Sequence, residues 1–237
     1  MKIKVIIPNA GMDRETLDSR ERMLSAALSE GTEISVDCIE EGPDSIESNT
    51  DEVLAGREVL RLCVKAEQDG FDAVVIYCFS DLAIQGAREL VSIPVIGPGE
   101  VALAAAEMVS VRFAVITTVR GNVSRTERRL MASSIAREKM KAVLPLDIPV
   151  AALREDPDAT IRYLKRTCEK AVTDYHVDTV ILGCLGMAQY GEELEKEFGI
   201  KVLDPAFLAV GYAEYAARLG IVPSRKASPS YRHELSL

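Results

Sequence analysis

Two stretches of the sequence decide the fold: Phe71-Asp72-Ala73-Val74-Val75-Ile76-Tyr77-Cys78 and Val177-Asp178-Thr179-Val180-Ile181-Leu182-Gly183-Cys184. They lie 106 residues apart (184 minus 78) and share one pattern. In each stretch, an acidic residue precedes a continuous run of apolar and β-branched residues, which is typical of a strand covered on both faces. Each run leads into a cysteine. The sequence therefore predicts the same buried strand in both halves of the chain.

The similarity between the halves extends to other segments. Ile93–Pro98 matches Ile200–Pro205 at an offset of 107 (200 minus 93), and Val5–Asn9 matches Ala114–Thr118 at an offset of 109 (114 minus 5). Amphipathic stretches separate the strands, and this alternation is typical of βαβ units that form a parallel sheet. We therefore expect a duplicated α/β unit of about 105 residues, close to the usual size of a domain.

The expected strands follow from the apolar β-branched runs, and the expected helices follow from the amphipathic stretches between them. The expected strands cover residues 3–8, 33–39, 72–77, 93–96, 112–117, 142–148, 178–183 and 200–203. The expected helices cover residues 13–29, 51–69, 81–91, 99–109, 123–139, 157–175, 188–198 and 206–219.

This order of elements predicts an α/β fold of two pseudo-symmetric lobes. Each lobe is expected to be a parallel sheet flanked by helices, with the active site in the cleft between the lobes. The N-terminal lobe covers 1–98 and is completed by a C-terminal helix over 205–223, and the C-terminal lobe covers 99–204. The lobes are expected to exchange their last helices, because each half ends in a strand, a proline and a helix. Residues 224–237 are expected to form a tail.

Composition excludes several classes of function. The chain has 237 residues, a formal net charge of -9, no Trp, two His and five Cys. Binding to nucleic acid regardless of sequence needs a basic face, so no nucleic-acid partner is expected. No apolar run approaches the roughly 18 residues of a membrane span, and the N-terminal apolar run is too short for a signal peptide. We therefore expect no membrane partner and a cytoplasmic location.

The cysteines raise a separate question. An odd number of them in a cytoplasmic chain argues against a disulfide framework. The absence of CxxC and HExxH motifs, together with only two histidines, argues against a zinc site, so no metal is expected. Cys38, Cys63 and Cys168 lie in apolar surroundings on an expected strand and on expected helices, which indicates a packing role.

Cys78 and Cys184 occupy a different kind of position. Each lies where a strand ends and a helix is expected to begin, at the sheet edge where parallel sheets bind ligands. A helix N-terminus favours a thiolate over a thiol. Two thiols on opposite sides of a planar carbanion could invert a carbon acid, since one removes a proton and the other supplies one. Such a reaction needs no cofactor where an adjacent carbonyl stabilises the carbanion.

These residues resemble the aspartate/glutamate racemase superfamily, and within it the hydantoin and allantoin racemases. The resemblance covers nearly the whole chain. It is carried by Ile7-Pro8-Asn9, Val75-Ile76-Tyr77-Cys78-Phe79-Ser80-Asp81, Phe113-Ala114-Val115-Ile116-Thr117-Thr118 and Ile181-Leu182-Gly183-Cys184-Leu185-Gly186-Met187. The last segment is the most specific, because that branch reads Gly-Cys-Ala-Gly-Met there.

The resemblance implies racemisation of a small-molecule substrate without a cofactor, with Cys78 and Cys184 as the acid–base pair. It also implies a homo-oligomer. The substrate contacts that it implies come from Pro8, Asn9, Phe79, Ser80, Thr117, Thr118, Gly183, Leu185, Gly186 and Met187.

The loops after the two cysteines indicate the substrate class. Amino-acid racemases of the superfamily usually have Asn-Thr after the first Cys, and Thr followed by His or Glu after the second. Here Phe79-Ser80 and Leu185-Gly186 stand in those places. The hydantoin branch commonly reads Cys-Phe-Gly-Asp, and Ser80 replaces that Gly. These neutral loops favour a neutral cyclic imide or ureide, so the expected substrate is a 5-substituted hydantoin or allantoin.

Other functions remain open at this stage. One alternative is an aspartate-type amino-acid racemase or a maleate cis–trans isomerase of the same superfamily. A malonate decarboxylase is disfavoured, because such enzymes tend to keep only one of the two cysteines. A third alternative is a non-catalytic small-molecule binding protein, which would leave the paired cysteines unexplained.

Overall fold

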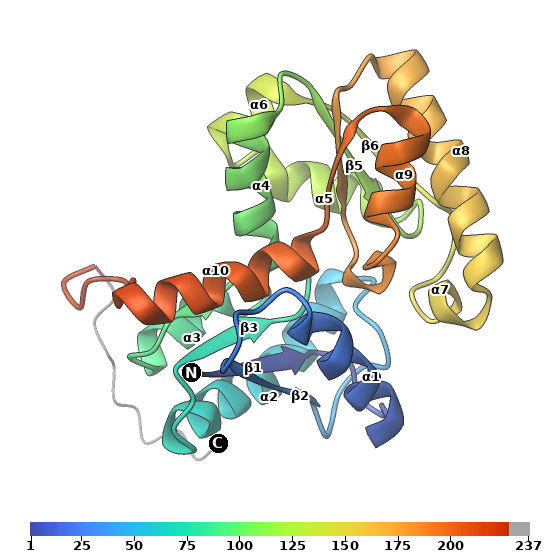
Figure 1. Ribbon diagram of the computed structural model, residues 1–237. Coiled ribbons are helices and arrows are strands. Elements are labelled where there is room, and N and C mark those ends of the chain that lie inside the picture. Colours follow the sequence, from blue (N-terminus) through green and yellow to red (C-terminus); the bar gives the residue numbers. More distant parts are fainter. Residues whose placement is uncertain (228–237) are drawn as a thin grey trace. The chain divides into compact units, whose positions relative to one another are not determined.

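The structure is a computed structural model that describes residues 1–227 (Figure 1). Residues 228–237, which make up most of the predicted tail, lie outside the described residues. The chain divides into two compact units. Of the described residues, unit 1 contains Met1–Pro98 and 206–227, and unit 2 contains Gly99–Pro205.

Unit 1 is built on a four-stranded parallel sheet in the order β2-β1-β3-β4. Its strands are β1 (Lys2–Ile7), β2 (Glu33–Cys38), β3 (Ala73–Ile76) and β4 (Val95–Ile96). Its helices are α1 (Arg14–Ser25), α2 (Asn49–Gln68), α3 (Ile84–Leu90) and α10 (Pro205–Leu219). Ile6 pairs with Ile76, so β1 and β3 end at the same edge of the sheet.

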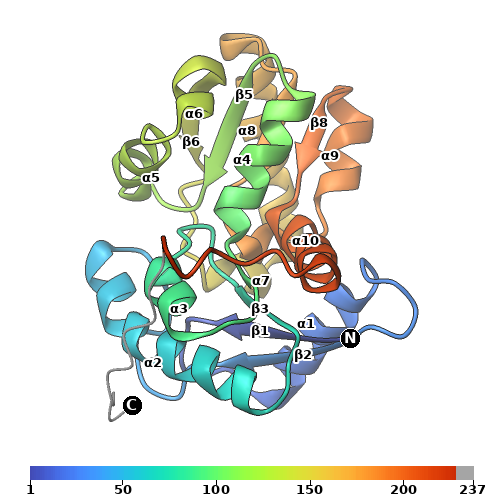
Figure 2. The same ribbon diagram turned by 90° about the vertical axis from the view of Figure 1, so that its left-hand side faces the viewer.

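Unit 2 repeats this arrangement with the order β6-β5-β7-β8. Its strands are β5 (Phe113–Thr117), β6 (Met140–Pro145), β7 (Thr179–Leu182) and β8 (Lys201–Leu203). Its helices are α4 (Pro98–Val109), α5 (Asn122–Leu130), α6 (Ser134–Lys139), α7 (Ala152–Glu155), α8 (Pro157–Tyr175), α9 (Gly191–Phe198) and the 3₁₀ turn η1 (Leu185–Met187). Figure 2 shows α4, α8 and α9 around β5 and β8. The predicted α/β fold with two parallel, helix-flanked sheets is thus confirmed.

Side-chain caps fix where the long helices begin. Asp13 accepts a hydrogen bond from the Thr16 N–H ahead of α1, and Ser48 does the same for Asp51 ahead of α2. In unit 2, Asp156 caps α8 by accepting from the Ala159 N–H at 2.8 Å. Such caps satisfy N–H groups that have no partner inside the helix, and they thereby stabilise its first turn.

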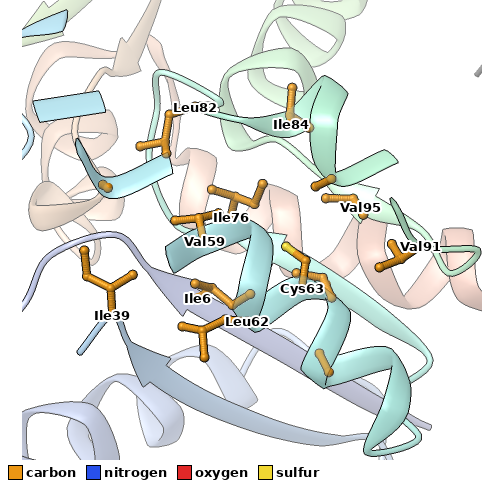
Figure 3. Packing of buried hydrophobic residues seen from close by; sticks show 14 of the residues in the cluster. Ile6, Ile39, Val59, Leu62, Cys63, Ile76, Leu82, Ile84, Val91 and Val95 are labelled. Carbon is orange, nitrogen blue, oxygen red and sulfur yellow. The ribbon is translucent and has the colours of Figure 1, made fainter. Parts of the chain in front are cut away.

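The apolar core of unit 1 lies between α2 and the sheet. Figure 3 shows Val59, Leu62 and Cys63 of α2 beside Ile6 of β1 and Ile76 of β3. Cys63, Ile6 and Ile76 have no exposed surface. Burying a side chain of this size contributes about 1.5–3 kcal/mol. Successive residues of β1 and β3, which point to opposite faces of the sheet, are buried from Ile3 to Ile7 and from Ala73 to Ile76, and this explains their continuous apolar runs.

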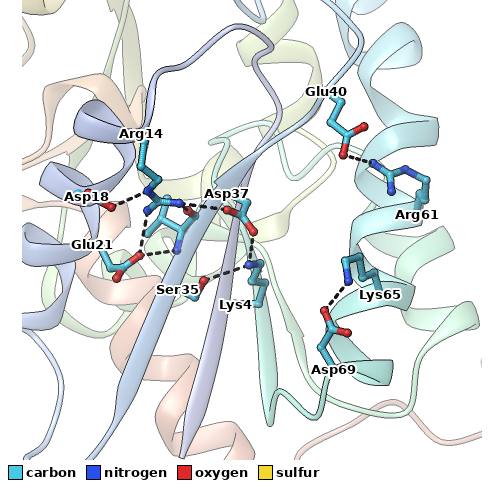
Figure 4. Close-up of polar contacts among 11 residues, drawn as sticks. Lys4, Arg14, Asp18, Glu21, Ser35, Asp37, Glu40, Arg61, Lys65 and Asp69 are labelled. Atoms are coloured by element: carbon cyan, nitrogen blue, oxygen red, sulfur yellow. Dashed lines mark hydrogen bonds and ion pairs between the residues drawn. The ribbon is translucent and has the colours of Figure 1, made fainter.

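Polar contacts tie β1, β2 and α1 together in unit 1 (Figure 4). The Lys4 ammonium, on a side chain that is largely buried, pairs with Asp37 of β2 and donates to the Ser35 hydroxyl at 3.0 Å. Arg14 of α1 pairs with Asp18 at 2.6 Å and with Asp37 at 3.4 Å. A buried lysine needs such partners, because an unpaired charge in the interior is destabilising.

The core of unit 2 has the same plan. Leu164 and Cys168 of α8 share a buried cluster with Ala114 and Ile116 of β5. Cys168 follows Cys63 by 105 residues (168 minus 63), close to the offset of the matching strands. The two mid-helix cysteines therefore occupy equivalent packing positions in the two units.

The last helix of each half belongs to the other unit. α4 follows β4 but groups with unit 2, whereas α10 follows β8 and groups with unit 1. Glu214 of α10 accepts hydrogen bonds from the Ser29 hydroxyl at 3.0 Å and from the Thr32 hydroxyl, just ahead of β2. In unit 2, Lys139 donates to the Glu107 and Ser110 carbonyls at 2.6 and 2.8 Å, at the end of α4.

Some helix boundaries differ from the sequence-based prediction. The single helix expected over 123–139 is two helices, because a turn at 131–133 ends α5 and Ser133 enters α6 with an extended backbone. The helix expected to begin at 81 begins at Ile84, since Asp81 and Ala83 both have positive φ angles, of 53° and 57°. The short elements α7 and η1 were not predicted.

Candidate active site

Cys78 lies in the loop that follows β3. The Tyr77 N–H donates to the Ile6 carbonyl at 2.8 Å and continues the pairing of β1 with β3 by one residue. Cys78 comes next and is half-buried, and its Sγ lies 3.2 Å from Oγ of Ser80. The thiol thus stands at the carboxyl end of a central strand, with a hydroxyl group beside it.

The backbone of this loop is unusual. Asp81 and Ala83 adopt left-handed conformations, which L-residues rarely do, and such strain tends to gather at functional sites. The Asp81 N–H donates to the Cys78 carbonyl at 3.0 Å. A Cβ on Gly97 would lie 2.6 Å from Cγ of Asp81, so the absence of a side chain at position 97 leaves room for the Asp81 carboxyl group.

The loop also corrects one expectation. Cys78 does not lie at the N-terminus of α3, because the left-handed residues delay that helix until Ile84, six residues later (84 minus 78). The argument that a helix N-terminus favours the thiolate therefore does not apply to Cys78.

Cys184 lies in the matching loop after β7. The Gly183 N–H donates to the Ile116 carbonyl at 2.7 Å, and a Cβ on Gly183 would lie 2.7 Å from that same oxygen. Only glycine fits this close approach. Cys184 follows, half-buried, and its carbonyl accepts from the Met187 N–H at 3.0 Å. Here a short helical turn, η1, does begin directly after the cysteine.

The backbone of Gly186 runs beside the second thiol. A Cβ at this position would lie 3.5 Å from Sγ of Cys184 and 2.9 Å from Cδ1 of Leu153 in α7. Leu153 is fully buried, so α7 closes this side of the Cys184 loop. This contribution from a four-residue helix could not be expected from the sequence pattern.

The other predicted site residues follow the first strand of each sheet. Pro8 is buried after β1, and Asn9 donates its Nδ2–H to the Asp44 carbonyl at 2.9 Å. Thr117 ends β5 and Thr118 follows it, and both are buried. Because β1 neighbours β3 and β5 neighbours β7, each unit brings one polar strand end and one cysteine to the same sheet edge.

The apolar members of the predicted site are buried. Phe79, Leu185 and Met187 have exposed fractions of 4%, 3% and 0%. Met187 packs in the core of unit 2 with the α8 and β7 residues. These side chains hold the two cysteine loops onto their sheets. Their contact with a substrate stays a prediction.

One residue near the site was missed in the sequence. Asn122, at the start of α5, is buried and donates its Nδ2–H to Oγ1 of Thr118 at 3.1 Å. Its Oδ1 accepts from the Arg125 guanidinium at 3.2 Å. The sequence did offer a signal for Asn122. It lies four residues after Thr118, directly ahead of the helix expected over 123–139.

No metal site is formed in the part of the chain that the structure describes. Within residues 1–227, no three His, Cys, Asp or Glu side chains gather in a way that would hold a metal ion. In the same range, no helix combines the length and the apolar character that crossing a bilayer requires.

Comparison with known proteins identifies the family. Residues 3–213 match the model of the Asp/Glu/hydantoin racemase family. The chain belongs to this family. Hydantoin racemases from Pseudomonas sp. (strain NS671) and Rhizobium meliloti are each 34% identical to it, over 98% of this chain and 92% and 95% of theirs. The solved structure of allantoin racemase from Klebsiella pneumoniae superposes with a TM-score of 0.91 at 30% identity, covering 100% of this chain and 96% of that one.

These relatives place the chain in the hydantoin and allantoin branch, as the sequence motifs predicted. The protein is therefore an enzyme of the isomerase class, a racemase that acts on a small molecule.

The racemase carries two kinds of cysteine. Burial raises the pKa of the Cys63 and Cys168 thiols to about 12, so both stay protonated at neutral pH. Their predicted packing role is confirmed. Cys38, at the end of β2, is half-buried with Sγ 3.9 Å from the Met12 carbonyl oxygen. Cys78 and Cys184 alone among the five follow the central strands β3 and β7.

Proposed function

We propose that the enzyme inverts the α-carbon of a 5-substituted hydantoin or of allantoin, with Cys78 and Cys184 as the acid–base pair. The observation that carries the proposal is the equivalence of the two cysteines. Each is the second residue after a strand, and β3 and β7 hold the same place in their sheets. The names of the relatives, hydantoin racemase and allantoin racemase, support the substrate class.

The reaction is a pair of proton transfers. One thiolate removes the proton from the α-carbon, so that a C–H bond breaks and an S–H bond forms. The electron pair left on carbon delocalises onto the adjacent carbonyl. The other thiol then gives its proton to the opposite face of the carbon and becomes a thiolate. The protein gains and loses one proton, and exchange with water restores its starting form.

The residues around the thiols support a neutral substrate. Phe79, Ser80, Leu185 and Gly186 carry no charge, and a free amino acid would need partners for its ammonium and carboxylate groups. A hydantoin ring is neutral, and its own carbonyl acidifies the α-carbon. We propose that Asn9, Thr117 and Thr118 contact its polar groups, together with the backbone of the two cysteine loops.

The proposal is tested by following one enantiomer in heavy water. The substrates are a panel of 5-substituted hydantoins, allantoin, aspartate and maleate. The expected result is racemisation of a hydantoin or of allantoin, with one deuterium gained at the α-carbon for each inversion. Turnover of aspartate or maleate alone would assign the enzyme to a different reaction of its superfamily.

The thiols are tested by single substitutions. Cys78→Ser and Cys184→Ser should each abolish racemisation, because a serine hydroxyl ionises far less readily than a thiol. Cys63→Ser is the matched control, since the Cys63 thiol is buried in the core. This substitution is predicted to leave the racemisation rate per folded molecule unchanged. Homo-oligomer formation and a cytoplasmic location stay predictions.

A further inference from the structure

The thiol of Cys78 has a hydroxyl neighbour in its own loop. Sγ of Cys78 and Oγ of Ser80 are 3.2 Å apart, within hydrogen-bonding distance for sulfur. Ser80 is half-buried, and the buried side chains of Phe79 and Leu82 hold the loop on either side of it. A thiolate has no proton to donate. When Cys78 is ionised, the Ser80 hydroxyl is therefore the donor of this bond.

The matching position in unit 2 has no such group. The offset that pairs Cys78 with Cys184 pairs Ser80 with Gly186 (186 minus 80 is 106). Position 186 nevertheless lies next to the Cys184 thiol, because a Cβ at this position would be 3.5 Å from Sγ of Cys184. A side-chain hydroxyl therefore stands beside the thiol at position 80, whereas position 186 carries no side-chain hydroxyl.

We propose that Ser80 is a positioning residue that favours the ionised form of Cys78, and with it the form of the enzyme in which Cys78 is the base and Cys184 the acid. This inference rests on the two-thiol function proposed above. The enantiomer whose α-proton faces Cys78 reacts with the form in which Cys78 is ionised and Cys184 is protonated. The other enantiomer reacts with the form in which Cys78 is protonated and Cys184 ionised. Exchange of protons with water interconverts the two forms.

This asymmetry has a kinetic signature. Enantiomers have equal free energies, so kcat/KM must be the same in both directions of a racemisation. A shift in the balance between the two protonation forms therefore changes the individual kcat and KM values of the two enantiomers, but leaves their kcat/KM values equal. Removing the Ser80 hydroxyl is expected to change the ratio of the two kcat values while the ratio of the kcat/KM values stays at about one.

The titratable groups of this loop, and the arginine of the helix that follows it, are the same in every variant of Ser80. Tyr77 and Asp81 are the titratable side chains of this loop. The Asp81 carboxyl group lies against Gly97. The Arg88 guanidinium of α3 donates to the Val95 carbonyl at 3.0 and 3.1 Å. A comparison among Ser80 variants therefore isolates the effect of the hydroxyl.

The experiment measures the alkylation of each cysteine in the full chain without substrate. Iodoacetamide reacts with the thiolate, and mass spectrometry of peptides separates Cys78 from Cys184. Rates are followed from about pH 5 to about pH 10. For Ser80→Ala, the midpoint of the Cys78 profile should rise by about one pH unit, since a hydrogen bond to a charged group is lost. Ser80→Thr keeps the hydroxyl and should restore the wild-type profile.

A matched pair of variants tests the same chemistry in unit 2. Gly186→Ser and Gly186→Ala both require the Leu153 side chain to give way, because Cδ1 lies 2.9 Å from the new Cβ. Only serine adds a hydroxyl beside Cys184. The midpoint of the Cys184 profile should therefore be lower with serine than with alanine.

The outcomes separate this inference from the proposed function. A Cys78 midpoint unchanged in Ser80→Ala and in a second variant, Ser80→Gly, overturns the role of Ser80, even when the enzyme racemises hydantoins. A shifted midpoint in a protein that racemises nothing in the panel supports the effect of Ser80 on Cys78 and overturns the proposed function.

Discussion

Cys63 and Cys168 keep their protons because burial in the apolar cores of the two units raises the pKa of each thiol to about 12. Cys78 and Cys184 have the same chemistry but lie half-buried at strand ends. The sequence separated these pairs by position along the elements, since two cysteines lay in mid-helix and two followed strands. It could not supply the contact between Cys78 and Ser80, because the left-handed turn that follows depends on packing around Asp81 and Gly97.

The raised pKa values predict how stability depends on pH. In the unfolded chain these thiols ionise near their ordinary pKa, whereas in the folded protein they stay protonated to about pH 12. The free energy of unfolding should therefore fall as pH rises above about 9, by up to 1.4 kcal/mol per pH unit for each thiol. Chemical denaturation of the wild type and of Cys63→Ala/Cys168→Ala measures this. The double variant should show a shallower decline, and equal slopes would contradict the assignment.

At the scale of elements, the strands were predictable and the short helices were not. All eight expected strands form. Continuous apolar runs identify strands buried on both faces, such as β3, and alternating apolar residues identify strands with one less buried face, such as β2. η1 is a single turn, and α7 is four residues long and is held by Leu153 packing into the core. Such elements exist through tertiary contacts, which leave no periodic pattern in the sequence.

Gly183, the residue after β7, lies very close to the backbone of β5, and this contact gives a prediction. Gly183→Ala would place a Cβ 2.7 Å from the Ile116 carbonyl oxygen, a backbone atom that cannot give way alone. The expected loss of stability is about 1–3 kcal/mol, and racemase activity should fall because Cys184 is displaced. Gly191→Ala is the control, since its new Cβ would meet Val202 at an ordinary 3.6 Å. Urea denaturation and racemisation rates measure both, and equal behaviour of the two variants would count against this packing argument.

At the scale of the whole chain, the fold consists of one α/β pattern used twice, and each half contributes its last helix to the other unit. The repeat was readable from the sequence because matching strands recur at nearly constant offsets. The hydrogen bonds that hold α10 against the rest of unit 1 could not be predicted from the sequence, since Glu214 lies more than 180 residues from Ser29 and Thr32.

Removal of that contact should destabilise unit 1. The Thr32 and Ser29 hydrogen bonds hold the pKa of Glu214 below its usual range, so this stabilisation is present at neutral pH and is lost as pH falls through that lowered pKa. Glu214→Ala should lower the free energy of unfolding by about 1–2 kcal/mol at pH 7. Glu192→Ala, which removes a fully exposed pair with Lys196, should leave the free energy of unfolding almost unchanged. Equal losses in urea denaturation would show that Glu214 does not anchor α10.

The pairing of Cys78 with Cys184 is tested most directly by measuring deuterium uptake and inversion together, starting from each pure enantiomer of a 5-substituted hydantoin. The wild type should invert both enantiomers with uptake of one deuterium. Cys78→Ser and Cys184→Ser should lose inversion, while the remaining thiol still exchanges the α-proton of one enantiomer, a different one in each variant. Inversion at the wild-type rate in either variant would contradict the two-thiol account.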